Sequence, residues 1–178
     1  MDVFSQDQEN PVNSSRNSIN FGFASVQTSS LSVNYEHLFG TSNGMVLGLP
    51  VFNFYESTNR GFSLSYRRHL ISGMNSGFWG IFVNYASITS EIRSDDVSTN
   101  NNNEYRFKSK SLSIGPNIGL RWVDQTGINI VIRAGYGIPF TTFKWVDTPA
   151  DPKFAKHHET AFKVITGIDG ELTIGYCF

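Results

Sequence analysis

The chain has 178 residues, the length of one domain, and carries 14 Lys and Arg against 15 Asp and Glu, a formal net charge of −1. That balance offers no basic surface of the kind that nucleic acids require. A single cysteine, Cys177, excludes an internal disulfide and a multi-cysteine metal site. Only 16% of residues are charged, whereas Ser, Thr and Asn number 21, 12 and 16; together with 14% aromatics and 16 glycines, this composition is typical of many strands.

The first part of the chain is polar, and we expect a flexible segment at residues 1–17 before one β-barrel domain at residues 18–178. The opening residues MDVFSQDQENP do not form a complete signal peptide. Either the protein remains inside the cell, or the sequence begins near the mature end of a secreted precursor. No stretch of about 20 predominantly apolar residues predicts a helical membrane span.

Apolar and polar residues alternate with period two, which indicates strands with two different faces. The last strand shows the pattern, because Leu172, Ile174 and Tyr176 lie on one face while Thr173 and Gly175 lie on the other. This alternation predicts an all-β fold, an eight-stranded antiparallel up-and-down β-barrel. The composition of its polar face and the lengths of its connections, described below, favour a transmembrane β-barrel. We expect its strands at residues 19–26, 30–39, 44–55, 60–70, 77–92, 105–123, 127–145 and in a segment ending at Phe178.

The polar face of these strands is predicted to point into the barrel. It consists mainly of Gly, Ser and Asn, which suit a crowded interior, whereas a face in contact with water is normally rich in Lys and Glu. Three acids and three arginines also lie on it, the balance that confined charges need. The predicted interior charge network is Glu36, Arg67, Arg121, Arg133, Asp169 and Glu171.

An alternative is a soluble, lipocalin-like barrel that binds a small hydrophobic ligand, because alternation does not say which face is inside. In that barrel the apolar face would form the pocket, lined by Phe21, Tyr66, Ile132 and Ile174.

Connection lengths favour the membrane barrel. The connections at residues 40–43, 71–76 and 124–126 are short, whereas residues 93–104 and 146–160 on the other side are long, an asymmetry typical of outer-membrane barrels. Aromatic residues also occur at two heights about 9 to 11 residues apart, the length of one strand crossing. The predicted interface aromatics are Phe39, Trp79 and Trp122 near the short turns, and Tyr55, Tyr85 and Tyr136 on the far side.

The final strand, GELTIGYCF, resembles the C-terminal assembly signal of Gram-negative outer-membrane barrels, carried here by Tyr176 and Phe178. That signal usually has Gly where this chain has Thr173. Residues 19–178 are similar to small eight-stranded, OmpA/OmpX-like outer-membrane proteins, with strands such as SLSVNYEHLF, GMNSGFWGIFVNY and LSIGPNIGLRW. The resemblance implies a bacterial outer-membrane location, a signal peptide cleaved from the precursor, insertion by the barrel-assembly machinery, and no established chemistry.

Two long connections are candidates for recognition, because binding residues concentrate on loops held by rigid scaffolds. Residues 93–104 are interpreted as a polar surface loop with Asp95, Asp96, Asn101 and Glu104; these could hold a cation, but their spacing matches no calcium loop. In the second connection, Asp151 as a cap and Pro152 at the first position predict a short helix over the barrel mouth. The alternative is that residues 160–167 extend the last strand.

Nothing in the sequence indicates catalysis. His37 and His69 fall on opposite faces of different strands, and no G-x-S-x-G motif accompanies them. The adjacent His157 and His158 do not have the i, i+4 spacing of a metal pair, and Cys177 is interpreted as structural filler. We therefore expect a protein that is not an enzyme and has no cofactor or metal. Its expected role is structural or adhesive, and its expected partners are outer-membrane lipid, the assembly machinery and an extracellular or envelope protein, with no nucleic acid.

Overall fold

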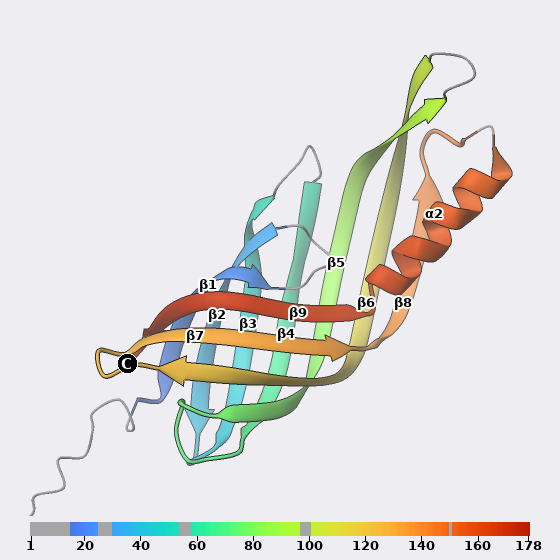
Figure 1. Cartoon of the computed structure of the whole chain (residues 1–178). Coiled ribbons are helices and arrows are strands. Elements are labelled where there is room, and N and C mark those ends of the chain that lie inside the picture. The colour runs from blue at the N-terminus through green and yellow to red at the C-terminus, as the bar shows by residue number, and fades with distance from the viewer. Residues whose placement is uncertain (1–14, 25–29, 54–57, 97–100, 150) are drawn as a thin grey trace, which may run out of the picture.

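The chain forms a closed, eight-stranded antiparallel β-barrel with one short helix (Figure 1). The computed structural model describes residues 15–24, 30–53, 58–96, 101–149 and 151–178. Consecutive strands from β1 to β7 pair with one another, β8 pairs with β6, and β9 closes the ring by pairing with both β1 and β7. The strands are β1 (Asn17–Ala24), β2 (Ser30–Phe39), β3 (Asn43–Asn53), β4 (Thr58–His69), β5 (Gly77–Asp96), β6 (Asn101–Val123), β7 (Ile128–Tyr136), β8 (Ile138–Trp145) and β9 (Ile168–Cys177).

The strands β7 and β8 are two halves of one barrel strand. Both pair with β6, but only β7 also pairs with β9. The continuous strand predicted at residues 127–145 is therefore interrupted, at Gly137. A Cβ atom on Gly115 of β6 would lie 2.3 Å from the Gly137 Cα atom, so the two glycines permit a backbone approach at the interruption that larger residues would prevent.

Side chains alternate strictly between the interior and the exterior of the barrel. Along β7, the isoleucines and Tyr136 are exposed, whereas Asn129, Val131 and Arg133 are buried. Val46, Phe78 and Phe82, which break the alternation in the sequence, also point inward and are buried. The interior thus combines polar and charged groups with a few large apolar side chains.

The two ends of the barrel differ. At one end, here called the turn end, residues 40–42, 70–76 and 124–127 connect neighbouring strands, and the C-terminus lies beside the last of these turns. At the other end, the helix end, β5 and β6 extend well beyond the remaining strands (Figure 1). The short turns agree with the sequence-based expectation.

The prediction of a surface loop at residues 93–104 is wrong over most of that range. The backbone of residues 93–96 pairs with that of residues 101–104, so both belong to a long β5–β6 hairpin. Asp and Asn are poor strand formers on their own. They continue the strands here because each added pair extends a ladder already anchored in the barrel.

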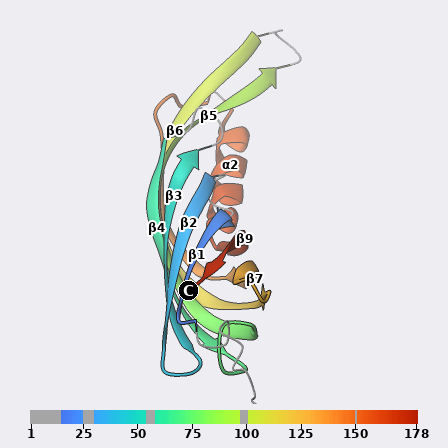
Figure 2. The ribbon, with the colours of Figure 1, turned by 90° about the vertical axis from the view of Figure 1, so that its left-hand side faces the viewer.

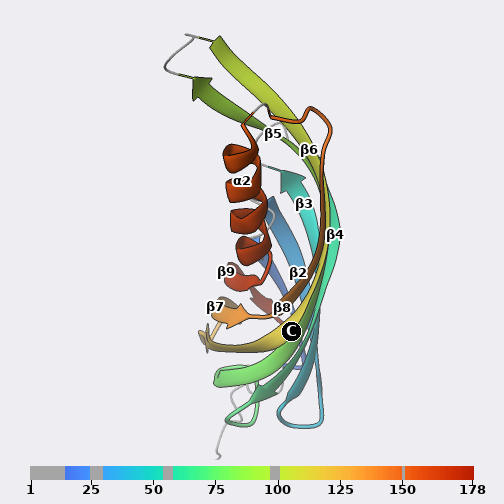
Figure 3. The same cartoon turned by 90° about the vertical axis from the view of Figure 1, so that its right-hand side faces the viewer.

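The helix α2 (Pro152–Ile165) lies against the concave inner face of the wall formed by β5, β6 and β8 (Figures 2 and 3). The Asp151 carboxylate caps it by accepting from the Lys153 amide at 2.8 Å, and Pro152 occupies the first turn. The predicted helix is confirmed, and the alternative of an extended last strand is wrong, because residues 160–165 are helical. Within the described residues, no helix has the length and apolar content to cross a membrane.

Two aromatic residues of α2 make three ring contacts that hold the helix on the wall. The Phe162 ring lies 5.4 Å from Phe107 and 5.5 Å from Phe143, centroid to centroid, and the Phe154 ring lies 5.9 Å from Tyr105. Phe107 and Phe143 are stacked at 4.8 Å. The helix therefore packs on aromatic groups of the inner face, and the outer face of β6 and β8 remains uncovered by it.

The turn between β6 and β7 depends on one carboxylate. Asp124 Oδ1 accepts from the Thr126 hydroxyl at 2.7 Å, the Thr126 amide at 2.8 Å and the Ile128 amide at 2.9 Å. These bonds, the Thr126 hydroxyl foremost, hold the pKa of Asp124 below its usual value.

A carboxylate with a lowered pKa stabilises the folded state above its unfolded pKa of about 3.9, and this stabilisation disappears as the pH falls through the folded value. We expect Asp124→Asn to remove this contribution, so that the variant loses less stability than the wild type below pH ~4. Urea unfolding monitored by Trp fluorescence at pH 3 and pH 7 measures the difference. Parallel losses in both proteins would contradict the role given to this turn.

Candidate functional site

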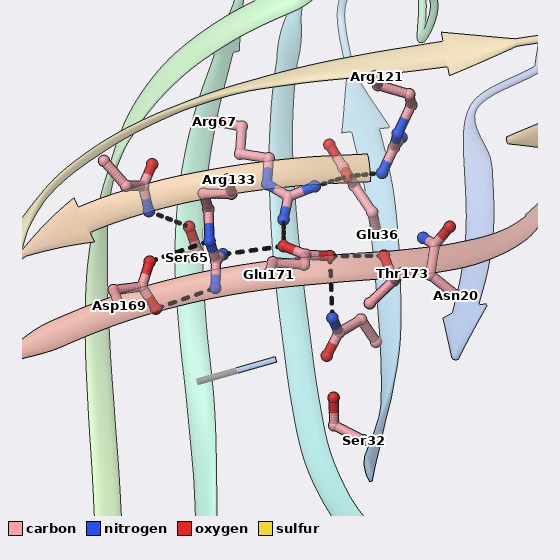
Figure 4. A network of polar contacts seen from close by, with 12 residues as sticks. Asn20, Ser32, Glu36, Ser65, Arg67, Arg121, Arg133, Asp169, Glu171 and Thr173 are labelled. Carbon is pink, nitrogen blue, oxygen red and sulfur yellow. Dashed lines mark hydrogen bonds and ion pairs between the residues drawn. The ribbon is translucent and has the colours of Figure 1, made fainter. Parts of the chain in front are cut away.

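The structure brings all six predicted interior charges together in one buried network (Figure 4). They come from five different strands of the barrel wall, and each residue is at most 4% exposed to solvent. Three arginines face three carboxylates, so the formal charges cancel. The members are Glu36 on β2, Arg67 on β4, Arg121 on β6, Arg133 on β7, and Asp169 and Glu171 on β9.

Glu36 is the centre of the part of the network nearest the turn end. Its Oε2 accepts from Arg67 Nη1 at 2.7 Å and from Arg121 Nη2 at 2.5 Å. Its other oxygen, Oε1, lies 3.0 Å from His69 Nε2. One carboxylate thus contacts two guanidinium groups and an imidazole, all without exposure to solvent.

Arg67 connects the part of the network around Glu36 with a second part, formed by Glu171, Arg133 and Asp169. Its Nη2 donates to Glu171 Oε2, and its guanidinium lies 4.5 Å above the centre of the Phe78 ring. Arg133 approaches the same Glu171 oxygen through Nη1 at 3.3 Å and Asp169 Oδ2 through Nε at 2.9 Å. The network therefore ties β2, β4, β6, β7 and β9 to one another across the barrel interior.

Neutral side chains satisfy the remaining carboxylate positions. Asn34 Nδ2 and the Thr173 hydroxyl donate to Glu171 Oε1 at 3.0 and 3.1 Å, and Asn84 Nδ2 donates to Asp169 Oδ1 at 3.1 Å. Because every carboxylate is paired with at least one arginine, and Glu171 and Asp169 also accept from neutral side chains, the network fills the barrel interior with mutually paired groups.

Beyond the charges, the turn end is filled by apolar side chains. Leu38, Met74 and Cys177 form a buried cluster, against which Val123 packs. Met74 reaches inward from the turn at residues 70–76, and its sulfur contacts the Arg121 guanidinium. The Met74 side chain thus covers the charged network on the side of the turn end. Cys177 belongs to the same packing, because its sulfur lies 3.9 Å from the Met74 sulfur.

Several members of the site were missed from the sequence. The alternation assigns His69, Asn34 and Asn84 to the inner face, which is where the structure places them, but nothing indicated that they contact the charges. Met74 belongs to a turn, where no periodicity operates, so no pattern could have identified it. Conversely, His37 lies on the outer face, as expected from its opposite parity.

The outer surface carries a continuous belt of exposed apolar side chains. On β6 the outward residues from Leu112 to Trp122 are apolar, and Ile118 among them is 68% exposed. Every other strand contributes similar residues, among them Ile19, Phe21 and Phe23 on β1, Tyr35 on β2, Leu47 and Leu49 on β3, Phe62 and Leu64 on β4, Trp79 and Ile81 on β5, Ile130 and Ile132 on β7, Phe140 on β8, and Leu172, Ile174 and Tyr176 on β9.

The predicted interface aromatics lie on this outer surface. Phe39, Trp79 and Trp122 are exposed near the turn end, and Tyr136 is exposed at the far end of β7. Tyr85 is half-buried beside Phe62, with ring centroids 5.8 Å apart. Tyr55 lies outside the described residues. The C-terminal Tyr176 and Phe178 are both exposed on the same outer face.

The pocket predicted for a soluble barrel is not formed by the residues assigned to it. Phe21, Ile132 and Ile174 are about half exposed on the outer face, and the Tyr66 hydroxyl donates to Asn43 Oδ1 there. These side chains cannot line an interior cavity, since the strand alternation places the polar network inside.

The residues predicted for a recognition loop are not gathered into a loop. Asp95 pairs through the backbone with Asn102, and Asp96 with Asn101, near the tip of the β5–β6 hairpin. Glu104 lies lower in the same hairpin, opposite Arg93, and its side chain is exposed. Within the described part of the chain, no three His, Cys, Asp or Glu side chains form a metal-binding group.

Comparison with family models, with curated protein sequences and with solved structures finds no match to the chain.

Proposed function

We propose that the protein is a membrane-spanning β-barrel of the bacterial outer membrane, similar in design to OmpA/OmpX-like proteins, that acts as a non-enzymatic scaffold at the cell surface. The observation that carries the proposal is the apolar belt around the outside of a barrel whose interior is charged. The largest apolar patch on a soluble monomer covers about 300–600 Å². A belt contributed by every strand is what contact with lipid requires.

The height of the belt supports the same proposal. On β6 it runs from Leu112 to Trp122, which matches the roughly 9 to 11 residues of a tilted strand that crosses a bilayer. Tryptophan and phenylalanine lie at its turn end, and polar or charged residues follow beyond Leu112. Aromatic residues at the edge of an apolar band are typical of membrane barrels.

The experiment for this proposal compares boiled and unboiled protein on detergent gels after refolding in phosphocholine detergent or lipid. We expect the unboiled protein to migrate faster as a compact barrel that resists the gel detergent, and the boiled protein to migrate as an unfolded chain. Protease should also leave the barrel residues intact in vesicles. Identical migration together with complete digestion would contradict the proposal.

The closed interior leads to a prediction about transport. An eight-stranded barrel is just wide enough to be filled by side chains, and here the charge network and the Met74 cluster occupy it. We expect no stable open conductance when the protein is incorporated in planar bilayers. A steady ion-conducting state would contradict the proposed plug.

The segments most suited to recognition are the β5–β6 hairpin and α2, because both lie at the helix end, beyond the belt. We expect deletion of residues 95–102 to preserve the barrel, since it joins two residues, Ser94 and Asn103, that already face each other across the hairpin. Cells that display the shortened protein should lose adhesion conferred by the wild type while retaining the heat-dependent gel shift. Unchanged adhesion would contradict a role for the hairpin tip.

A further inference from the structure

The outer surface changes abruptly from apolar to cationic on the helix side of the belt. The registers of β4, β5, β6 and β8 align their outward residues in rows across the wall. The last apolar row is Phe62, Tyr85, Leu112 and Phe140, and the next is Arg60, Ser87, Lys110 and Thr142. The row after that includes Thr89, Lys108 and Lys144. Basic and hydroxyl groups thus replace apolar ones within one row.

The cations of these rows repel one another. Lys108 and Lys144 occupy directly opposed positions on β6 and β8, where like charges destabilise a sheet. Within the described residues, no carboxylate forms an ion pair with Lys108, Lys110 or Lys144. Arg106, one row farther from the belt, differs because its Nε lies 3.0 Å from Asp147 Oδ2.

A groove coincides with this cluster. It has a volume of about 350 Å³ and is lined by side chains of both kinds, hydroxyl and ammonium. Lysine ammonium groups bind phosphate as point charges, and hydroxyl groups add hydrogen bonds to its oxygens. The outward side chains in its lining are Ser87, Thr89, Lys108, Lys110, Thr142 and Lys144.

We propose that the groove between Lys108, Lys110 and Lys144 binds the phosphate group of a membrane lipid whose acyl chains lie along the apolar row beneath it. This inference rests on the proposed membrane location and goes beyond it by assigning a specific lipid site. The position of the groove favours lipid phosphate over phosphate in solution, because it directly adjoins Leu112 and Phe140 of the belt. A bound phosphate relieves the repulsion between Lys108 and Lys144, which no carboxylate among the described residues neutralises.

The helix α2 does not interfere with this site. It packs on Phe107 and Phe143, whose side chains point to the inner face, whereas the lysines alternate with them and point outward. Figure 3 shows α2 on the concave side of this wall. The groove lies on the opposite face, because the lysines that line it point outward.

The test measures the association of spin-labelled phosphatidic acid, relative to spin-labelled phosphatidylcholine, with the full chain in phosphatidylcholine bilayers. We expect the wild type to prefer phosphatidic acid by about tenfold and Lys108→Gln/Lys144→Gln to reduce this preference to twofold or less. The matched control is Lys153→Gln/Lys156→Gln, which removes two exposed charges from α2 and should leave the preference unchanged. Each variant is first shown to insert by its heat-dependent gel shift.

The outcomes distinguish failure of the proposed lipid site from failure of the proposed membrane location. Equal preference in the wild type and in Lys108→Gln/Lys144→Gln, with both inserted, overturns the lipid site and leaves the proposed function intact. Failure of the wild type to insert in phosphatidylcholine overturns both. The preference is also measured with inorganic phosphate added at millimolar concentration. If the phosphate abolishes the preference, the groove is a site for free phosphate and the assignment to lipid is overturned. If the preference persists, the assignment to lipid is supported.

Discussion

Replacement of Glu36 by Gln is expected to lower the free energy of unfolding of the barrel by about 3–5 kcal/mol, the typical effect of removing one partner from a buried ion pair. Glu36 contacts Arg67, Arg121 and His69 with no exposure to solvent. The isosteric amide keeps the volume but leaves two buried guanidinium groups short of negative charge. Urea unfolding of the refolded barrel, followed by Trp fluorescence, measures the loss.

The control for this substitution is Glu159→Gln on α2. Glu159 also pairs with a cation, Lys163 at 2.7 Å, but both side chains are more than 40% exposed, so the pair contributes less than about 1 kcal/mol. A second variant, Glu36→Gln with Arg121→Met, removes one excess charge and should recover part of the lost stability. Equal effects of Glu36→Gln and Glu159→Gln would contradict a stabilising interior network.

Replacement of Ile132 by Lys is expected to destabilise the barrel in a bilayer by about 2–4 kcal/mol, the typical cost of a lysine on the lipid face near the bilayer midplane. Ile132 lies outward in β7, between Ile130 and Ala134. In a soluble barrel the same substitution would place a lysine in water, where a surface change has an effect within about 0.5 kcal/mol. Unfolding in lipid vesicles measures the difference.

The matched control is Val146→Lys. Val146 is exposed to a similar degree as Ile132, but it follows β8 beyond the cationic rows and so lies outside the belt. We expect this lysine to cost at most about 1 kcal/mol, as near a membrane interface. If both lysines have the same small effect, the belt is not in contact with lipid.

Most of the barrel could be predicted from the sequence because its two faces meet different environments. Period two is independent of tertiary contacts, so the eight strands and the face shared by residues such as Arg121 and Glu171 follow from local parity. The Gly, Ser and Asn content of that face and its balanced charges indicate that it points inward. The capped helix was equally local, since Asp151 and Pro152 define its start. Connectivity inside the barrel was not predictable, because it depends on which strands face each other across the interior.

The errors have identifiable causes. Residues 93–104 have the composition of a loop, yet their backbone follows the β5–β6 ladder, so pairing with a neighbouring strand outweighed residue preference. The interruption at Gly137 was invisible because Ile138 and Phe140 continue the same alternation across it. Met74 enters the interior from a turn, where side-chain direction follows the turn's own geometry.

The contact between belt and lipid is tested most directly by quenching of a fluorescent label on the belt. A bimane group is attached at Ile118→Cys in a chain in which Cys177 is replaced by Ser. The labelled protein is reconstituted in lipids brominated at the middle of the acyl chain, and the quenching of bimane fluorescence by bromine is measured. Ile118 is 68% exposed in the belt on β6, and Val146→Cys beyond the belt provides the reference. We predict strong bromine quenching at position 118 and little at position 146. Equal, weak quenching at both, with a monomer that stays dispersed after detergent removal, would contradict the membrane barrel.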